Sequence, residues 1–438
     1  RNMRIGIVGF GREGKMALEY WGNQAAEISV YDQNESLEVP TTCTKRLGSN
    51  WKDLLLADSP ALDLIVRSPG VPLWDIEDIV QGKVTTVTKE FFELCPCPII
   101  GITGTKGKGT TATLIYEILK TDGKDVHLVG NIGTPSLSIL PKLTPQSIVV
   151  YELSSFQLFD LHKSPQIAIC LLVTEDHLDW HKDIQQYQAS KGNIFKYQKE
   201  EDAAIWFQDN EVSTQLSALS IAKNKIPYGT NALVRVNEND FFTYNNEEIC
   251  AAKDALLPGK HNEQNICAAI AATWALVDKK SIVQAIKTFK GLPFHIETIA
   301  THNGITFVND SFATNPTATD VAIESMIAPT TLLIGGVDRG LHLEPFVTSI
   351  EKSLFIKDVI VYGEERDRIS KLFSLHNIPH VVITGNFEDV FRAAIQKTKT
   401  GETILFSPGA PSFDMFKDYQ DRGLAFNALV AKYVQDLL

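Results

Sequence analysis

Short apolar runs alternate with amphipathic segments along most of this chain. Runs such as Met3–Val8, Leu64–Val66 and Ile167–Val173 are flanked by glycine, proline or polar residues, which is typical of buried strands. In Thr110–Lys120 the apolar residues recur at the helical period, and Gly123 follows as a stop signal. This alternation predicts an α/β fold built on mostly parallel sheets.

The chain has 438 residues, which is too long for one ordinary core. The chain is divided by a proline-containing linker at Cys95–Pro98 and by a second break at Lys290–Pro293. We expect the stretch before the second break to be rich in helices. We therefore predict three domains: an N-terminal Rossmann-like domain, a central P-loop ATPase-like domain with a mostly parallel sheet, and a C-terminal Rossmann-like domain. Their predicted bounds are residues 1–95, 96–292 and 293–438.

The composition of the chain excludes several functional classes. Its formal net charge is −12, whereas a general nucleic-acid binder needs a basic surface that displaces counterions. No apolar run approaches the roughly 18 residues that span a bilayer, and no charged-then-apolar leader precedes the first strand. The cysteines form no CxxC pair, and no neighbouring histidine has a spacing suited to zinc binding. We therefore expect a cytoplasmic protein with small-molecule ligands, no nucleic-acid partner and no membrane insertion.

The segment Gly101–Thr111 has the composition of a phosphate-binding loop. Its glycines let backbone N–H groups converge on phosphate oxygens, the following helix adds partial positive charge, and Lys108 can reach the outer phosphates. Gly109 stands where such loops usually carry the magnesium-binding hydroxyl, so Thr110 or Thr111 must supply it. A glycine-rich turn without a ligand is the alternative. The ATP-binding residues predicted in this loop are Gly104, Thr105, Lys106, Gly107, Lys108, Gly109, Thr110 and Thr111.

A second glycine-rich loop, Gly9–Gly14, follows the first predicted strand, and Asp32 ends the next strand. This GxGxxG pattern is typical of a dinucleotide-binding Rossmann unit. A tight turn that packs a helix against a strand is the alternative. An NAD-dependent dehydrogenase would also need a hydride-transfer site, which no feature of the sequence supplies.

Five further motifs occur in a fixed order along the chain. Together with the phosphate loop, they resemble the Mur ligases over nearly the whole sequence. They are Gly130–Gly133, Glu152–Leu158, Thr174–Asp179, Asp310–Asn315 and Ser407–Asp414.

The resemblance implies an ATP-dependent acid–amino-acid ligase. In this family an acyl phosphate forms when the substrate carboxylate attacks the γ-phosphate of ATP, and an amine then displaces phosphate. The match implies addition of glutamate to UDP-N-acetylmuramoyl-L-alanine in peptidoglycan precursor synthesis. D-Glutamate is the expected enantiomer and L-glutamate is the alternative. We expect a monomer that uses ATP and two Mg²⁺ sites.

The same resemblance assigns the catalytic and metal-binding roles. Lys108 would contact the outer phosphates, and Thr110 with Glu152 would hold one magnesium ion. His177 and a carbamylated Lys191 would hold the second, since carbon dioxide converts a lysine cation into an anionic oxygen ligand. From residue type alone, Lys191 is instead expected to be a solvated surface group.

The remaining site residues are also assigned by the resemblance. The nucleotide would contact Asn262, Asn265 and Asp310, although helix capping is the alternative role for the asparagines. The muramoyl and uridine diphosphate parts of the substrate would contact Gly11, Arg12, Asp32, Ser68, Asn131, Ser154 and Gln157. Glutamate would contact Thr314, Arg339, Ser412 and Tyr419, where a guanidinium suits a dicarboxylic acid and a solvated surface position is the alternative for the arginine.

The sequence departs from the family pattern at three places. Phe312 stands in the place of a lysine, Phe294-His295 replaces the usual His-Arg, and Gly109 is more typical of folylpolyglutamate synthases. The alternatives are therefore a folylpolyglutamate synthase-like ligase and a non-catalytic nucleotide-binding homologue.

Overall fold

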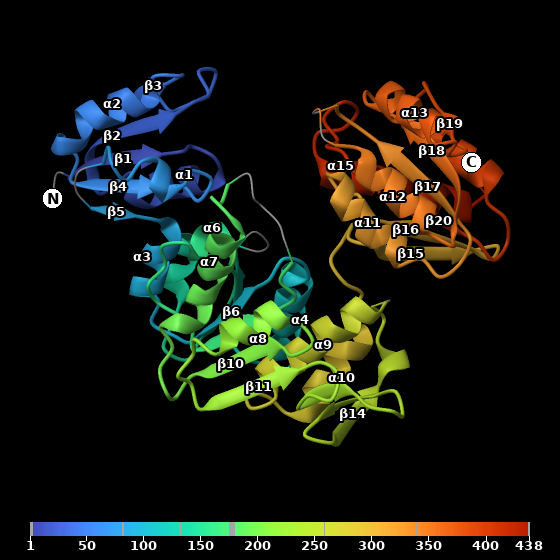
Figure 1. The fold of residues 1–438 in the computed structure, drawn as a ribbon, viewed down its shortest axis with the longest axis horizontal. Helices are drawn as coiled ribbons and strands as arrows, with labels where there is room; N and C mark the ends of the chain where they lie inside the picture. The colour runs from blue at the N-terminus through green and yellow to red at the C-terminus, as the bar shows by residue number, and fades with distance from the viewer. Residues whose placement is uncertain are drawn as a thin grey trace. The chain divides into compact units, whose positions relative to one another are not determined.

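The computed structural model describes residues 3–80, 83–130, 134–174, 180–257, 259–338, 340 and 342–436. The fold is mixed α/β with sheets that are mainly parallel, as the alternation of strands and helices predicted (Figure 1). The chain divides into two compact units: residues 1–256 with 260–289, and residues 257–259 with 290–438. Among the described residues, none of the helices combines the length and the apolar character that a bilayer crossing requires.

The first unit begins with a five-stranded parallel sheet in the order β3-β2-β1-β4-β5. Because all of its strands run parallel, the loops at the carboxyl ends of β1, β2 and β4 lie along one edge of the sheet. The elements are β1 (Met3–Val8), α1 (Arg12–Trp21), β2 (Ala25–Asp32), β3 (Thr44–Leu47), α2 (Trp51–Asp58), β4 (Leu64–Arg67), β5 (Val84–Thr85) and α3 (Val87–Leu94).

The second sheet of this unit has nine strands in the order β14-β13-β12-β11-β10-β9-β6-β8-β7. Its parallel part comprises β6 (Ile99–Thr103), β7 (Val126–Val129), β8 (Ile148–Glu152), β9 (Ile167–Cys170), β10 (Ala203–Phe207), β11 (Asn224–Tyr228) and β12 (Val234–Val236). Its antiparallel extension adds β13 (Phe241–Tyr244) and β14 (Glu247–Ala251). The helices are α4 (Lys108–Thr121), α5 (Ser136–Ile139), α6 (Ser155–Leu158), α7 (Ile184–Lys196), α8 (Glu211–Ser217), α9 (Lys260–Thr273) and α10 (Lys279–Thr288).

The expectation that the stretch before residue 290 is rich in helices is only half right. Strands β10 to β14 lie within residues 203–251, with only the short helix α8 among them, and α9 and α10 follow. The turns between β12 and β14 place Asp240, Asn245 and Asn246 at positive φ, which asparagine and aspartate tolerate better than most residues. These polar turns join short strands that lack a long apolar run.

The second unit is built on a six-stranded sheet in the order β15-β16-β20-β17-β18-β19. The pair β15–β16 is antiparallel and the other pairs are parallel. Its elements are β15 (Glu297–His302), β16 (Ile305–Asn309), α11 (Pro316–Glu324), β17 (Thr330–Gly335), α12 (Glu344–Lys352), β18 (Ile356–Tyr362), α13 (Arg366–Leu375), β19 (Val381–Val382), α14 (Phe387–Lys397), β20 (Thr403–Phe406) and α15 (Tyr419–Val434).

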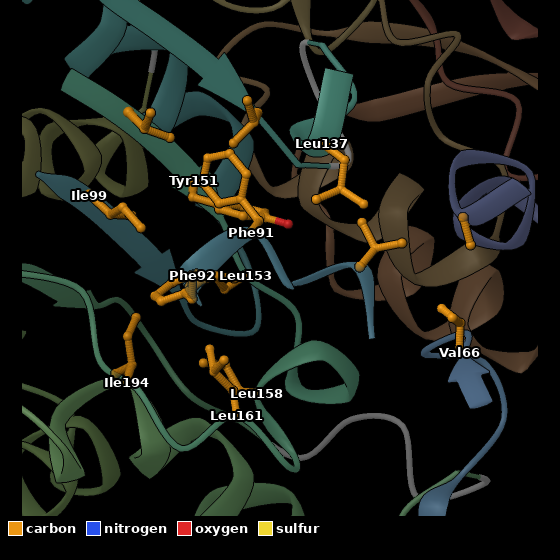
Figure 2. Packing of buried hydrophobic residues seen from close by; sticks show 14 of the residues in the cluster. Val66, Phe91, Phe92, Ile99, Leu137, Tyr151, Leu153, Leu158, Leu161 and Ile194 are labelled. Carbon is orange, nitrogen blue, oxygen red and sulfur yellow. The ribbon is translucent and has the colours of Figure 1, made fainter. Parts of the chain in front are cut away.

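One buried cluster extends from the first sheet to the second. At its centre, Tyr151 of β8 packs against Phe91 and Phe92 of α3, with ring centroids 5.4 and 5.9 Å apart (Figure 2). Aromatic pairs in this range add stability beyond their buried area. Helix α3 therefore carries the chain from the first sheet into the core of the second, and the two sheets share one compact unit.

Candidate active site

The phosphate loop leaves β6 after Thr103 and enters α4 at Lys108. Gly104 has φ +149° and Gly107 has φ +87°, backbone conformations that L side chains rarely adopt. A Cβ atom at Gly104 would lie 2.7 Å from Leu171 Cβ, and one at Gly107 would lie 2.4 Å from Asn265 Oδ1. Both glycines are therefore needed where the sequence predicted them, and α4 begins directly after the loop, which puts the positive end of the helix dipole beside it.

Lys108 lies across this loop. Its Nζ donates hydrogen bonds of 3.0 and 3.1 Å to the carbonyl oxygens of Gly104 and Thr105. Thr110 and Thr111 are buried in the first turn of α4, whereas Lys106 is exposed at the tip of the loop. The loop thus combines an oriented ammonium group with the positive end of a helix, a combination that attracts phosphate.

Two strands flank β6 and bring further groups to the same edge of the sheet. Glu152 is the last residue of β8 and pairs in register with Ile102, and its side chain is almost fully buried. On the other side, Thr174 follows β9, where its backbone N–H and carbonyl both bond to Thr105 Oγ1. The predicted phosphate loop and the predicted carboxylate therefore lie at adjacent carboxyl ends of parallel strands.

Lys191 of α7 contacts the phosphate loop directly. Its side chain is 2% exposed, and Nζ donates to Gly104 O at 2.9 Å and to Thr103 Oγ1 at 3.4 Å. The ammonium also lies 4.8 Å from the centre of the Tyr187 ring. The expectation from residue type, a solvated surface lysine, is wrong, because the helix α7 buries this face against β6.

Asn262 and Asn265 lie on α9, which packs against α4. Asn265 contacts Gly107 and donates from Nδ2 to Asn262 Oδ1 at 3.1 Å. Asn265 is the sixth residue of α9, so the alternative role of capping the helix does not apply to it. Both asparagines are nearly buried beside the phosphate loop.

Three predicted residues, Asn131, His177 and Arg339, lie outside the described residues. Within the described part of the chain, no group of three or more His, Cys, Asp or Glu side chains is placed to hold a metal ion. Among the oxygen groups that the structure does place near the phosphate loop are Glu152 and the threonine hydroxyls of α4.

The first glycine loop is stabilised by the two side chains that the sequence placed beside it. Asp32 Oδ2 accepts the N–H of Phe10 at 2.8 Å, and Ser68 Oγ donates to Gly9 O at 2.6 Å. A Cβ at Gly14 would lie 2.2 Å from Gly9 O, which explains the third glycine of the motif. Gly11 and Arg12 are exposed at its tip.

Ser154 and Gln157 form a capping box at the start of α6. Ser154 Oγ accepts the N–H of Gln157 at 3.2 Å, and Gln157 Oε1 accepts the N–H of Ser154 at 2.9 Å. Gln157 Nε2 then donates to Glu13 Oε1 of α1 at 2.7 Å. This last contact brings Ser154 and Gln157 to the helix that follows Gly11 and Arg12.

In the second unit, the loops after β16, β17 and β20 meet at one sheet edge. The backbone N–H of Gly409 donates to Ala313 O, and that of Val337 donates to Pro411 O. Thr314 is partly exposed in the first of these loops, Ser412 is buried in the third, and Tyr419 is the first residue of α15. The described residues assigned to glutamate therefore belong to one loop cluster and the helix beside it.

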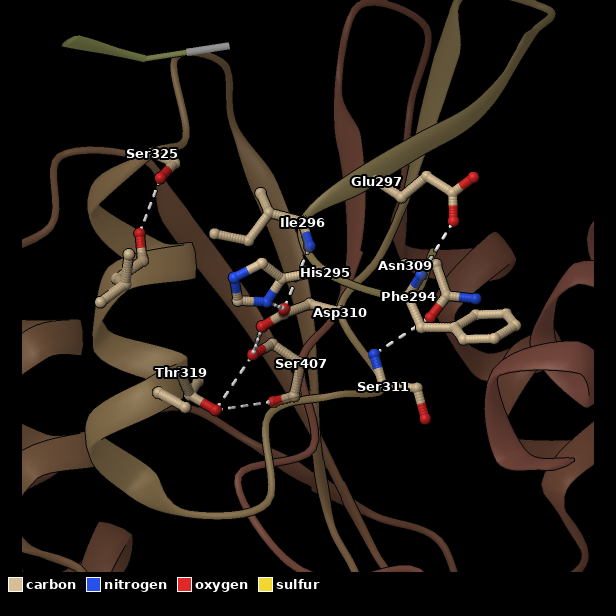
Figure 3. Close-up of polar contacts among 12 residues, drawn as sticks. Phe294, His295, Ile296, Glu297, Asn309, Asp310, Ser311, Thr319, Ser325 and Ser407 are labelled. Atoms are coloured by element: carbon tan, nitrogen blue, oxygen red, sulfur yellow. Dashed lines mark hydrogen bonds and ion pairs between the residues drawn. The ribbon is translucent and has the colours of Figure 1, made fainter. Parts of the chain in front are cut away.

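Asp310 lies beneath this edge rather than on its surface (Figure 3). Its Oδ2 accepts from Ser407 Oγ at 2.6 Å and its Oδ1 accepts from the N–H of Ile296 at 3.0 Å. Burial raises the pKa of this carboxyl to about 7, although these hydrogen bonds and the charge of Arg422 act in the opposite direction.

Two of the residues that depart from the family pattern, His295 and Phe312, form a row of aromatic side chains with Tyr419. Phe312 is 41% exposed, and its ring lies edge-on to His295 at 5.1 Å and to Tyr419 at 5.3 Å. His295 Nδ1 is 3.8 Å from Asp310 Oδ1. The row gives this part of the site an apolar surface where the family pattern has cations.

Several charged residues at these sites that are buried or partly buried escaped the sequence analysis. Glu13 lies within the glycine loop, Arg67 ends β4, and Asp160 follows α6; Arg67 Nη2 bonds to Asp160 Oδ1 at 2.8 Å. In the second unit, Arg422 donates to Ser311 O and Ala410 O, which joins the loops after β16 and β20. Glu13 and Arg67 were detectable by their position beside predicted loops, whereas Arg422 lies inside a helix and carries no local signal.

Comparison with known families assigns two segments of the chain. Residues 102–273 match the model of the Mur ligase middle domain, and residues 296–409 match that of the Mur ligase glutamate ligase domain. Proteins named UDP-N-acetylmuramoylalanine–D-glutamate ligase are similar over nearly the full length. The one from Acetivibrio thermocellus is 32% identical, covering 98% of this chain and 96% of that protein, and the one from a Geobacillus species (strain WCH70) is 34% identical, covering 98% and 97%.

Solved structures share the fold at lower identity. The UDP-N-acetylmuramate–alanine ligase MurC of Thermotoga maritima is 15% identical with a TM-score of 0.60, covering 99% of this chain and 100% of that one. The MurF ligase of the same organism, in complex with ADP, is 16% identical with a TM-score of 0.59, covering 100% and 96%. Escherichia coli FolC, also with ADP, is 16% identical with a TM-score of 0.55, covering 79% and 92%.

Proposed function

The chain belongs to the Mur ligase family, and we propose that it joins D-glutamate to UDP-N-acetylmuramoyl-L-alanine at the expense of ATP. The names of its relatives support both the substrate and the enantiomer, with L-glutamate as the alternative. The structural observation that supports the proposal is the contact of Lys191 with Gly104, which brings a buried lysine side chain to the phosphate loop.

The phosphate loop would bind the triphosphate of ATP. Lys108 lies where its ammonium can move from the carbonyls of Gly104 and Thr105 to the outer phosphates. Asn265, packed against Gly107, would support the nucleotide side of the loop, as would Asn262 beside it. Because both reaction steps concentrate negative charge, fixed N–H dipoles and cations would supply most of the catalysis.

The donor groups at the loop fit magnesium. Thr110 and Glu152 offer oxygen ligands, which Mg²⁺ prefers, and this ion commonly completes its shell with water and phosphate oxygens. Bound magnesium would neutralise charge on the γ-phosphate while the substrate carboxylate attacks. We propose Thr110 and Glu152 for one site and His177 with carbamylated Lys191 for the second. The burial of Lys191 against Gly104 supports its role.

The other substrates would bind at the loops beside these residues. We propose that Gly11, Arg12, Asp32 and Ser68 hold the uridine diphosphate, and that Asn131, Ser154 and Gln157 hold the muramoyl part. Glutamate would bind to the second unit through Thr314, Arg339, Ser412 and Tyr419, and Asp310 would contact the nucleotide.

We further propose that each sheet is the centre of one domain, with boundaries after residues 95 and 292 and with Rossmann-like first and last domains. Because every proposed binding residue belongs to one chain, we propose a monomer. The cytoplasm is its proposed location, since ATP and nucleotide-activated precursors are available there.

Phosphate release tests this function. Purified protein should release phosphate from Mg-ATP only when UDP-N-acetylmuramoyl-L-alanine and D-glutamate are both present, with slower release when L-glutamate replaces D-glutamate. If neither D-glutamate nor L-glutamate leads to phosphate release, the proposal is excluded. A non-catalytic homologue would bind ATP without turnover.

A folylpolyglutamate synthase-like activity is the second candidate, because Gly109 occupies the third position of a Gly-Lys-Gly-Thr sequence. FolC shares only the fold at 16% identity, whereas the glutamate ligase relatives match nearly the full length at 31–34%. Phosphate release with a reduced folate and glutamate would support this candidate, and its absence would dismiss it.

A further inference from the structure

Glu13 is an acidic residue inside the glycine loop that we assign to the uridine diphosphate. An acid in the first turn of a helix is ordinarily a solvated partner of the helix dipole. Here Oε1 accepts a 2.7 Å hydrogen bond from Gln157 Nε2, and Oε2 is buried with no hydrogen-bond partner among the described residues. Glu13 therefore turns away from solvent and toward α6.

The contact determines which way the Gln157 amide points. An ionised carboxylate only accepts hydrogen bonds, so Gln157 must turn its NH₂ group toward Glu13. Its oxygen then faces Ser154, where it accepts from the backbone N–H at 2.9 Å and from Oγ at 3.1 Å. The opposite orientation would place two donors face to face at Ser154 and two acceptors face to face at Glu13.

The far end of α6 is held to the first sheet in a similar way. Asp160 accepts from Arg67 at 2.8 Å through Oδ1, and Lys89 lies 2.8 Å from its Oδ2. Arg67 is fully buried and also donates to Val71 O at 2.7 Å. The segment from Ser154 to Asp160 is therefore connected to the first sheet at both ends, and Glu13 supplies the connection next to the glycine loop.

Electrostatics agree with a role in positioning. Burial raises the pKa of Glu13, while the Gln157 hydrogen bond and the nearby charges of Arg67 and Arg12 oppose that rise. A carboxylate that pointed to the tip of the loop would repel a diphosphate at close range. Directed to Gln157 instead, it leaves the backbone N–H groups of the loop to the phosphates.

We propose that Glu13 is a positioning residue for the muramoyl substrate: it fixes the Gln157 amide and so couples the diphosphate-binding loop to the muramoyl-binding segment. The proposal rests on the proposed function. One of the two Nε2 hydrogens of Gln157 bonds to Glu13, and on this proposal the second would bond to an acceptor on the substrate.

Direct binding of UDP-N-acetylmuramoyl-L-alanine, measured by titration calorimetry, tests the proposal. Replacing Glu13 by alanine should weaken this binding by about tenfold or more, as expected for a lost charged hydrogen bond, and leave ATP binding within about twofold. Glu13→Gln should restore most of the affinity, because its amide oxygen can still accept from Gln157. Glu19→Ala is the matched control, since Glu19 is exposed on the same helix.

The outcomes separate the two proposals. If the wild-type protein does not bind UDP-N-acetylmuramoyl-L-alanine, the proposed function fails. If the wild type binds and Glu13→Ala binds equally well, the role of Glu13 is excluded while the function stands. Equal weakening toward ATP and the muramoyl substrate, without rescue by Glu13→Gln, would show that Glu13 only maintains the fold, and denaturant unfolding of each variant would reveal the same defect.

Discussion

Lys191 Nζ lies 2.9 Å from the carbonyl oxygen of Gly104, so a side chain from α7 contacts the phosphate loop although 87 residues separate the two positions. Under the proposed function, a carbamate on this side chain would face the bound phosphate. Lys191→Ala should therefore lower kcat by about 100-fold, comparable to the loss of one electrostatic group in other active sites. Chloride or a small carboxylate should restore part of the rate by occupying the vacated position.

Lys196 provides the control for this experiment, because it is exposed in the last turn of the same helix. Lys196→Ala should retain the wild-type rate within about twofold, as is usual for exposed surface positions. Full activity of Lys191→Ala would show that the lysine is not part of the catalytic site.

Gly107 and Gly123 form a matched pair for the phosphate loop. Both have positive φ, +87° and +80°, so alanine costs a similar backbone strain of about 1 kcal/mol at each. Only at Gly107 would the new Cβ meet a neighbour, since Asn265 Oδ1 lies 2.4 Å away and nothing lies within 4 Å at Gly123. Gly107→Ala should raise the KM for ATP by about tenfold or more, whereas Gly123→Ala should leave it unchanged. Equal KM values would exclude the loop as the nucleotide site.

The ion pair of Arg67 and Asp160 is buried, with side chains 0% and 5% exposed. Removing one partner of a buried pair leaves an uncompensated charge and typically costs about 3–5 kcal/mol. Arg67→Ala should lower the free energy of unfolding in urea by this amount. The exposed pair of Lys52 and Asp75 is the control, and Lys52→Ala should cost less than about 1 kcal/mol. Similar losses for both variants would contradict the structural role of Arg67.

Asp310 should make stability depend on pH. Its folded pKa of about 7 exceeds the ordinary value of 3.8, so between these values the native state binds a proton that the unfolded chain lacks. Its stabilising contribution is complete below the unfolded pKa and is lost as the pH rises through 7. Each pKa unit corresponds to about 1.4 kcal/mol, so the loss should amount to several kcal/mol.

Chemical denaturation at pH 5 and pH 8 measures this effect. The wild type should lose more stability than Asp310→Asn over this interval. The difference between the two losses removes the contributions that both proteins share. His295 lies beside Asp310 and is the titratable neighbour whose contribution this subtraction does not remove. Identical slopes for the two proteins would show that Asp310 does not retain its proton in the folded state.

Local patterns predicted those elements whose boundaries are determined by nearby residues. The strand Met3–Val8 has the predicted bounds. The helix predicted from Thr110 to Lys120 runs from Lys108 to Thr121, so it is longer by only a few residues. In contrast, the strand expected to reach Val173 ends at Cys170. Leu172 O instead bonds to the N–H of Thr105, a contact 67 residues away that no local pattern encodes.

The candidate site also combines residues that local sequence identifies with residues that only distant contacts bring into place. Glycines such as Gly104 and Gly107 are recognisable because their backbone conformations impose a residue type. The position of Lys191 beside the phosphate loop depends on tertiary packing, and only the family resemblance identified this residue. The contact between Glu13 and Gln157 joins residues 144 positions apart, so no local pattern indicates it.

The fate of the carboxylate oxygens of the substrate tests the central claim most directly. UDP-N-acetylmuramoyl-L-alanine whose alanine carboxylate carries a heavy oxygen isotope at both oxygens should be incubated with the protein, Mg-ATP and D-glutamate, and the released phosphate analysed by mass spectrometry. If the carboxylate attacks the γ-phosphate, one labelled oxygen appears in each phosphate released as the amide forms. Unlabelled phosphate accompanying amide formation would contradict the acyl-phosphate route.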